Sequence, residues 1–277
     1  MSKVVLITGC SSGIGLATAV FLSKKGSRVY ASVRDFGKKD NLVAAAEKEN
    51  ASVEILQLDV TDDESVTKAV EQVIAKEGRI DVLINNAGYG LMGPAETVTI
   101  EQAKDEFEVN FFGLLRVTQA VLPCMRKQKS GHIINVSSIA GIKAMPTSDL
   151  YNASKFAVEG LTEAMAPTMA LAGIRMSLIE PGPVATQFNK GSMKVGERMK
   201  GVELYKKVTE KMIANRNKRF RDAQKPEEIA ALINEAVTAE KPHLRYQTSD
   251  WVRNAAGEKL KELTGDQLVK FYVDMLK

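Results

Sequence analysis

Short apolar runs alternate with longer segments of helical periodicity along most of this chain of 277 residues. The apolar runs show little polar alternation, as expected of strands that are buried on both faces. They are residues 4–7, 28–33, 53–58, 80–84, 132–136 and 176–179. Strands that alternate with helices in this way form a parallel sheet with helices on both faces. The pattern therefore predicts an α/β fold, in which residues 1–277 form a single domain around a doubly wound parallel sheet.

Polar residues and glycines mark where several predicted helices begin and end. The segments from Thr61 to Glu64 and from Thr99 to Gln102 both fit the capping box that starts a helix. Gly26 is suited to end the first helix, and a late helix is expected to begin near Pro226. The interval from residue 187 to about residue 241 has no strand signal. We assign residues 187–222 of it, which are rich in Met and Lys, to a lid over the substrate.

Composition excludes several classes of protein. With 44% hydrophobic and 26% charged residues the chain is typical of soluble globular proteins. The net charge of +4 is dispersed among acidic residues, so no nucleic-acid-binding face is expected. Two cysteines, Cys10 and Cys124, and two histidines, His132 and His243, provide neither a disulfide framework nor a metal-ligand set. No apolar run suits a secretory signal or a membrane span, so we expect a cytoplasmic protein without a metal. Peripheral membrane contact through an amphipathic C-terminal segment stays open.

A glycine-rich loop follows the first predicted strand and opens the first helix. This context makes a glycine pattern meaningful and predicts a Rossmann-type dinucleotide site. Gly9 permits the tight turn, Gly13 lets the backbone approach a pyrophosphate, and Gly15 lets the helix pack on the strand. The N-terminus of the helix offers N–H groups to the anion. A plain strand-to-helix turn is the alternative. The loop residues assigned to the cofactor are Gly9, Ser11, Ser12, Gly13, Ile14 and Gly15.

The end of the second predicted strand indicates which dinucleotide binds. An acidic residue there accepts hydrogen bonds from the ribose hydroxyls, whereas a cation accommodates a 2′-phosphate. The chain has Val33 followed by Arg34. We therefore predict NADP(H) in preference to NAD(H), with Arg34 near the phosphate. Alternatively, Arg34 is an ordinary surface residue paired with Asp35.

Tyr151 and Lys155 are spaced to share one face of a helix. A phenol is a poor proton carrier at neutral pH because its usual pKa is about 10. A nearby ammonium would favour the phenolate and lower the phenol pKa. Taken alone, the pair is better explained by an exposed helix face that carries both side chains.

The ordered series of motifs resembles the short-chain dehydrogenase/reductase family over residues 3 to 186. The series comprises the glycine loop, Leu58-Asp59-Val60, Asn85-Asn86-Ala87-Gly88, Asn110, Ser138, Tyr151 with Lys155, and Pro181-Gly182 followed by Val184 and Thr186. The resemblance implies that Tyr151 is the general acid/base and that Lys155 holds the nicotinamide ribose and lowers the phenol pKa. It implies that Ser138 orients the substrate oxygen and that Asn110 anchors a proton-relaying water. For Asn110, a purely structural bond to helix backbone is the alternative.

The same resemblance implies further residues around the cofactor. Asp59 and Val60 would flank the adenine, and Pro181 to Thr186 would seat the nicotinamide. The chain would then interconvert an alcohol and a carbonyl by hydride transfer, with proton transfer by Tyr151. The residues implied in cofactor binding beyond the glycine loop are Arg34, Asp59, Val60, Asn86, Ala87, Gly88, Tyr151, Lys155, Pro181, Gly182, Val184 and Thr186.

Within the family the chain is most similar to the subgroup of 17β-hydroxysteroid and retinol dehydrogenases. The matching stretches are residues 30–35, 154–161 and 241–246. A lipophilic steroid, retinoid or terpenoid substrate is implied, because adaptable thioethers suit a bulky apolar ligand. Core filling is the alternative role for the methionines among the residues that follow. The substrate residues are Ser138, Tyr151, Met92, Met145 and Phe188, with Leu91, Ile142, Pro183, Met193, Met199 and Met212 as further lining.

Two other functions fit the same fold. One is a non-catalytic NADP-binding sensor or scaffold, which would bind cofactor without turnover. The other is a reductase of small ketones. For assembly, the helices after Thr99 and Asn152 are expected to pair in a homodimer or homotetramer, as the family often does.

Overall fold

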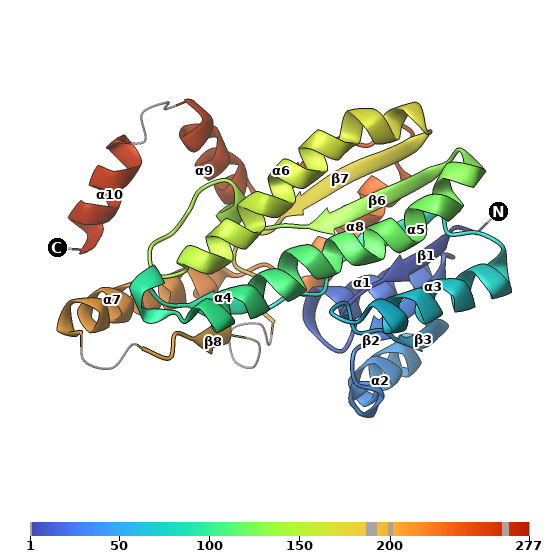
Figure 1. The fold of residues 1–277 in the computed structure, drawn as a ribbon, viewed down its shortest axis with the longest axis horizontal. Coiled ribbons are helices and arrows are strands. Elements are labelled where there is room, and N and C mark those ends of the chain that lie inside the picture. The colour runs from blue at the N-terminus through green and yellow to red at the C-terminus, as the bar shows by residue number, and fades with distance from the viewer. Residues whose placement is uncertain (1, 187–192, 199–201, 262–265, 277) are drawn as a thin grey trace.

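The structure is a computed structural model, and it describes the chain except residues 1, 187–192, 199–201, 262–265 and 277. Its centre is a parallel sheet of seven strands in the order β3-β2-β1-β4-β6-β7-β9 (Figure 1). The strands are β1 (Val4–Ile7), β2 (Arg28–Val33), β3 (Val53–Gln57), β4 (Val82–Asn85), β6 (Gly131–Val136), β7 (Ile174–Glu180) and β9 (Arg245–Gln247). The strand order reverses direction between β1 and β4. In a doubly wound sheet, ligands usually bind beside the carboxyl ends of the strands at such a reversal.

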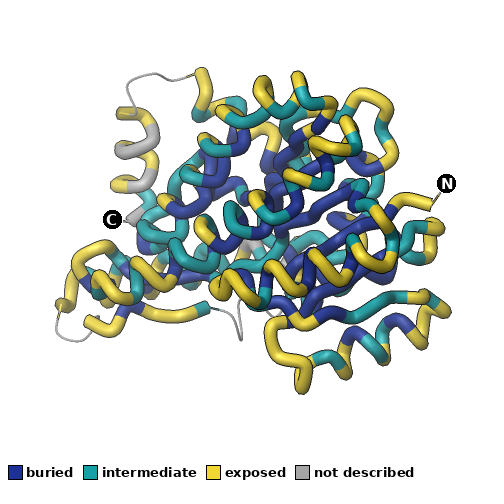
Figure 2. Tube along the Cα trace, turned by 45° about the vertical axis from the view of Figure 1, so that its right-hand side comes forward, coloured by how far each residue is buried: buried dark blue, intermediate teal, exposed yellow. Residues whose placement is uncertain are grey.

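Helices cover both faces of the sheet, in two layers that the apolar side chains define. One core cluster joins the sheet to α1, α2 and α8, and the other joins it to α3, α5 and α6 (Figure 1). Figure 2 shows the buried strands enclosed between helices whose outer faces are exposed. Because both clusters share one sheet, the chain forms a single α/β domain, as predicted. The helices are α1 (Gly13–Lys24), α2 (Asp40–Lys48), α3 (Asp63–Glu77), α4 (Ile100–Phe107), α5 (Leu114–Gln128), α6 (Asp149–Leu171), α7 (Glu203–Arg219), α8 (Pro226–Thr238), α9 (Asp250–Lys261) and α10 (Asp266–Leu276).

All six predicted strands are present, and their boundaries differ by at most two residues. The fourth begins at Val82 instead of residue 80, because the Ile80 N–H donates to the Gln128 side chain instead of joining the sheet. The apolar pattern missed β9, which is a short edge strand of partly buried residues. It also missed a small second sheet, in which β5 (Gly90–Met92) pairs with β8 (Met193–Val195).

The predicted helix signals have mixed outcomes. The capping box from Thr99 to Gln102 is confirmed, as is the helix that begins at Pro226. The box predicted at Thr61 is wrong, because the Thr61 hydroxyl donates to Asp59 and the N-cap is Asp62, whose side chain accepts from the Ser65 N–H. The polar stretch allowed either residue to cap, and the loop geometry after β3 selects the second.

The C-terminal third places additional elements around the carboxyl end of the sheet. Helix α7 lies beside the short sheet that contains β8, and α9 and α10 lie beyond β7 (Figure 1). The predicted lid of residues 187–222 therefore contains β8, α7 and a 3-10 turn, Phe220–Asp222, while its residues 187–192 and 199–201 lie outside the described part. None of the helices within the described residues has the length and apolar character to cross a membrane.

Candidate active site

A cleft of about 810 Å³ lies along the carboxyl edge of the sheet. The residues that directly follow five strands reach it: Arg34 after β2, Leu58 after β3, Asn86 after β4, Ser137 after β6 and Pro181 after β7. Parallel strands present their carboxyl ends at one edge, so segments far apart in sequence meet there. Of the residues assigned to the cofactor, to catalysis or to direct substrate contact, all but three line this cleft. The exceptions are Gly15, Asn110 and Phe188, the last of which lies outside the described residues.

The glycine loop gives one end of the cleft its shape. Gly9 has a φ of +73°, and a Cβ there would lie 2.8 Å from the Cα atom of Ala87. Gly13 has a φ of +60° and opens α1. The N-cap residue of α1, Ser12, makes no side-chain capping bond, and the first turn carries no acidic residue. The helix therefore directs uncapped N–H groups and the positive end of its dipole at the cleft, an arrangement that suits a pyrophosphate.

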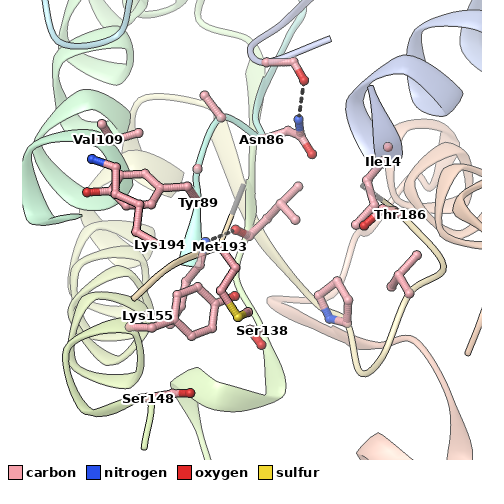
Figure 3. Close-up of a pocket in the computed structure, with 18 of the residues that line it drawn as sticks. Ile14, Asn86, Tyr89, Val109, Ser138, Ser148, Lys155, Thr186, Met193 and Lys194 are labelled. Carbon is pink, nitrogen blue, oxygen red and sulfur yellow. Dashed lines mark hydrogen bonds between the residues drawn. The ribbon is translucent and has the colours of Figure 1, made fainter. Parts of the chain in front are cut away.

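Asn86 and Ala87 support this loop from the neighbouring strand. The Asn86 side-chain amide donates to the carbonyls of Thr8 and Gly9 at 2.9 and 3.0 Å (Figure 3). The backbone N–H groups of Asn86 and Ala87 donate to the Thr8 hydroxyl. These bonds hold the loop in the conformation that the two positive φ angles require.

The part of the cleft that follows β2 carries two cations, Arg34 and Lys38. Arg34 is exposed and forms no ion pair within the described part of the chain. Its neighbour Asp35 instead accepts from the Gly37 N–H at 2.9 Å, so the alternative that pairs Arg34 with Asp35 is wrong. Val33 is buried. The strand end therefore presents the Arg34 guanidinium to the cleft, while the Asp35 carboxylate, which also lines it, is held by the Gly37 N–H.

Three polar side chains lie at the centre of the site. Tyr151 and Lys155 share α6, as their spacing predicts, with the Lys155 Nζ atom 5.9 Å from the centre of the tyrosine ring. Ser138 follows β6, and its hydroxyl is hydrogen-bonded to the Tyr151 phenol. Lys155 is 6% exposed and donates to the Val136 carbonyl at 2.9 Å (Figure 3). Two hydroxyl groups thus project into the cleft beside one buried ammonium.

Burial controls the charge states of this cluster. It raises the pKa of Tyr151 to about 12, against a lowering contribution from the Ser138 hydrogen bond. Burial also lowers the pKa of Lys155 to about 8. The prediction that the ammonium lowers the phenol pKa is therefore wrong for this structure. The physical reason is that burial disfavours the phenolate, and the groups that shift the phenol pKa, Ser138 and Glu106, do not include Lys155.

Asn110 lies beneath the cleft in a π-helical stretch, Glu108–Gly113. It is 1% exposed, and its amide group exchanges hydrogen bonds with the backbone of Tyr89 at 2.9 and 3.0 Å. These bonds join the π-helical stretch to the loop after β4 and not to the helix backbone that the alternative interpretation expected, and π-helical turns are frequent at functional sites. The predicted relay role of Asn110 stays a prediction.

A buried acid missed by the sequence analysis lies next to Asn110. The Glu106 side chain is fully buried on α4 and accepts from the Asn110 amide at 2.9 Å. Burial raises the pKa of Glu106 to about 8, and the charges of Lys155 and Lys194 oppose that rise. The available signal was its position one helical turn before Asn110 on the same face.

The remaining part of the cleft is mostly apolar. Met92 and Met145, both predicted, line it together with Pro183, Met193 and Met212. The expectation was wrong for Leu91 and Ile142, which are buried away from the cleft; Ile142 packs against Val252 in a small core. Met199 lies outside the described residues. The lining residues that were not predicted include Tyr89, Lys194, Arg216, Phe220, Trp251 and Met275.

Comparisons with known proteins identify the family of this chain. The family model of the short chain dehydrogenases matches residues 3–195. Human retinol dehydrogenase 8 is 38% identical over 263 residues, which span 89% of this chain and 81% of that protein. Human 17-beta-hydroxysteroid dehydrogenase type 1 is 41% identical over 257 residues, with 89% and 77% covered. The crystal structure of a short-chain dehydrogenase from Streptomyces avermitilis superposes with a TM-score of 0.83 at 32% identity and covers 99% of this chain and 97% of its own.

Proposed function

Because this chain belongs to the short-chain dehydrogenase family, whose members bind nicotinamide cofactors and act on CH–OH groups, we propose that it is an NADP(H)-dependent oxidoreductase of a lipophilic alcohol or carbonyl of steroid, retinoid or terpenoid type. The observation that carries the proposal is the hydrogen-bonded pair of Tyr151 and Ser138 in the cleft, beside Lys155. This pair supplies an acid and a hydrogen-bond donor for one substrate oxygen.

The cofactor's expected position follows from the shape of the cleft. The uncapped start of α1 and the glycine loop would hold the pyrophosphate, and Asp59 with Val60 would flank the adenine. Pro181, Gly182, Val184 and Thr186 would seat the nicotinamide, and Lys155 would hold its ribose. When bound, the nicotinamide supplies or accepts the hydride, which is the step that no side chain can perform.

Tyr151 is the proton-transferring residue in this proposal. With a pKa near 12 the phenol is protonated at neutral pH, which is the form that donates a proton to a carbonyl oxygen as an alcohol forms. Ser138 holds that oxygen at the phenol, because both hydroxyls meet at one point of the cleft. The charge states therefore favour the reductive direction at neutral pH, with oxidation of the alcohol rising as the pH approaches the phenol pKa.

The lining of the cleft supports a bulky apolar substrate. Five methionines line it from different segments: Met92, Met145, Met193, Met212 and Met275. Thioether side chains adapt to irregular apolar ligands, and both named human relatives are dehydrogenases of lipophilic alcohols. The helices after Thr99 and Asn152 are predicted to pair in a homodimer or homotetramer. The exposed aromatic side chains of Phe112, 46% exposed, and Phe156, 42% exposed, support this pairing.

The decisive experiment measures turnover with a substrate panel. NADPH oxidation and NADP reduction are followed with retinoids, steroids, terpenoid alcohols and small ketones, across pH 6 to 10. We expect the highest kcat/KM with a lipophilic carbonyl. Cofactor binding without any turnover would support the sensor or scaffold, and a preference for small ketones would support the second alternative.

Cofactor choice is tested by a substitution at the end of β2. The wild type is expected to use NADPH at least about tenfold better than NADH in kcat/KM, because Arg34 and Lys38 line the cleft where a 2′-phosphate would lie. In Val33→Asp a carboxylate replaces the buried valine and should reverse the preference by accepting hydrogen bonds from ribose hydroxyls. Val29→Ala, within the same strand but away from the cleft, serves as the packing control. A wild type that prefers NADH would contradict the prediction.

A further inference from the structure

Arg216 brings an unusual charge to the apolar part of the cleft. It lies in the last turns of α7 and lines the cleft between Met212 and Phe220, beside Asn215. Its Nη1 atom contacts the Met193 sulfur at 2.8 Å, and its Nε atom is buried without a hydrogen-bond partner in the described structure. Met193 projects into the same cleft as Ser138 and Lys155 (Figure 3). The guanidinium therefore lies on the lining of the same cleft as the hydroxyl pair of Tyr151 and Ser138.

Other partly buried arginines of this protein have carboxylate partners. Those in ion pairs are Arg28, Arg79, Arg116 and Arg245. Across the described residues no carboxylate pairs with Arg216, and burial alone shifts its pKa, downward. A thioether is only a weak acceptor for a guanidinium, and a partly buried cation without an anion is costly. The side chain is thus suited to an acceptor that the described residues do not supply.

Lys194, a second cation of this region, has a carboxylate partner, which Arg216 lacks among the described residues. Lys194 is half exposed, its Nζ atom is 3.9 Å from the Asp105 carboxylate, and it lies 4.7 Å from the centre of the Tyr89 ring. Lys194 adds positive potential to the same wall, while Asp105 balances it. Within the described lining of this apolar region, only Arg216 presents unbalanced charge.

We propose that the substrate is an amphipathic acid, with a lipophilic body that carries the reacting alcohol or carbonyl and an oxyanion group that pairs with Arg216. This inference rests on the proposed function and narrows its substrate class. Guanidinium forms paired hydrogen bonds with carboxylate, sulfate or phosphate, and a desolvated position strengthens them. The methionines that line the cleft contact the lipophilic body of the substrate, between its reacting group and its oxyanion group. Neutral substrates would leave the guanidinium without an acceptor.

The test uses probe pairs that share the lipophilic body and the reacting carbonyl and differ in charge at the other end. A long-chain keto acid is compared with its methyl ester, and a steroid that carries one ketone and one hydroxyl is compared with its sulfate ester at that hydroxyl. Reduction with NADPH is measured in the wild type, Arg216→Met and Arg216→Lys. Lys218→Met removes a cation from the exposed face of the same helix and is the matched control. Melting temperatures confirm that each variant is folded.

We expect the wild type to prefer the anionic member of at least one pair. Arg216→Met should lower kcat/KM for that member about tenfold to a hundredfold, the range of a charge-assisted hydrogen bond, and change the neutral member less than about threefold. Arg216→Lys should retain part of the preference, and Lys218→Met should retain all of it. A charge preference that is absent in the wild type, or unchanged in Arg216→Met, overturns the proposal.

Two further measurements distinguish a substrate-binding role of Arg216 from a cofactor-binding role. If Arg216 served the cofactor's pyrophosphate instead, Arg216→Met would raise the KM for NADPH about tenfold and affect both members of a pair equally, which would overturn the proposal. Equilibrium dialysis of the same probes against cofactor-loaded protein reports binding without turnover. A preference for the acid that is lost in Arg216→Met would support the site even if no probe were reduced, so failure of the proposed reaction is distinguishable from failure of the site.

Discussion

Replacing Tyr151 with phenylalanine is expected to reduce the turnover of every carbonyl substrate by about a thousandfold, within the range measured for loss of a general acid. The ring remains and continues to pack in the cleft, so only the hydroxyl that donates the proton is lost. Ser138 keeps its bond from the Ala140 N–H and can still hold the substrate oxygen, but a serine hydroxyl is too weak an acid to replace the phenol. NADPH binding should change less than about twofold, because the phenol supplies little of the charge that holds the dinucleotide.

Tyr89→Phe is the matched control for this substitution. Tyr89 lines the same cleft, and its hydroxyl is buried without a hydrogen-bond partner in the described structure. Removing that hydroxyl should change kcat by a small factor and raise the stability, since an unsatisfied polar group is removed. Single-turnover kinetics with preloaded NADPH measure the chemical step in both variants. Near-normal turnover of Tyr151→Phe, or equal losses in the two variants, would contradict the assignment of Tyr151.

The fold was predictable because its local signals agree with one another. The runs that became β1, β2, β6 and β7 are apolar on both faces, and the glycines at the start of α1 permit only a turn there. The edge strand β9 has no such pattern, since its residues are only partly buried. The pairing of β5 with β8 joins segments about a hundred residues apart, and no local period encodes it.

The site was predictable where one helix or one loop fixes the spacing. Tyr151 and Lys155 share a face of α6, and the glycine loop is contiguous. Their charge states were not predictable, because the depth of burial depends on residues from several elements. Arg216 and Trp251 reach the cleft only through the packing of α7 and α9 around the sheet edge. Within the polar sequence of α7, nothing local distinguishes Arg216 from the neighbouring surface cations.

Lys155→Met is expected to lower kcat/KM about a hundredfold or more, as is typical when a preorganised electrostatic donor is removed from an active site. The ammonium would hold the cofactor's ribose beside the phenol, and the methionine has similar length without charge or donor. NADPH should also bind more weakly, unlike in Tyr151→Phe. The pair of variants thus separates proton donation from cofactor positioning, since only one of them should change both kcat and cofactor affinity.

Lys155→Met is also expected to change the pH dependence of the free energy of unfolding, which a loss of packing alone would not do. Burial lowers the pKa of Lys155 to about 8 from its usual 10.5, while Glu106 and Glu159, which face it, act in the opposite direction. Below pH 8 both folded and unfolded chains bind the proton, so the folded state carries the full cost of the buried cation. Between pH 8 and about 10.5 only the unfolded chain holds the proton, and wild-type stability should rise relative to Lys155→Met by up to about 3 kcal/mol. Urea unfolding of both proteins from about pH 7 to about pH 10.5 measures this difference. A free-energy difference that is constant over that interval would show that Lys155 is not desolvated as its burial beside the Val136 carbonyl requires.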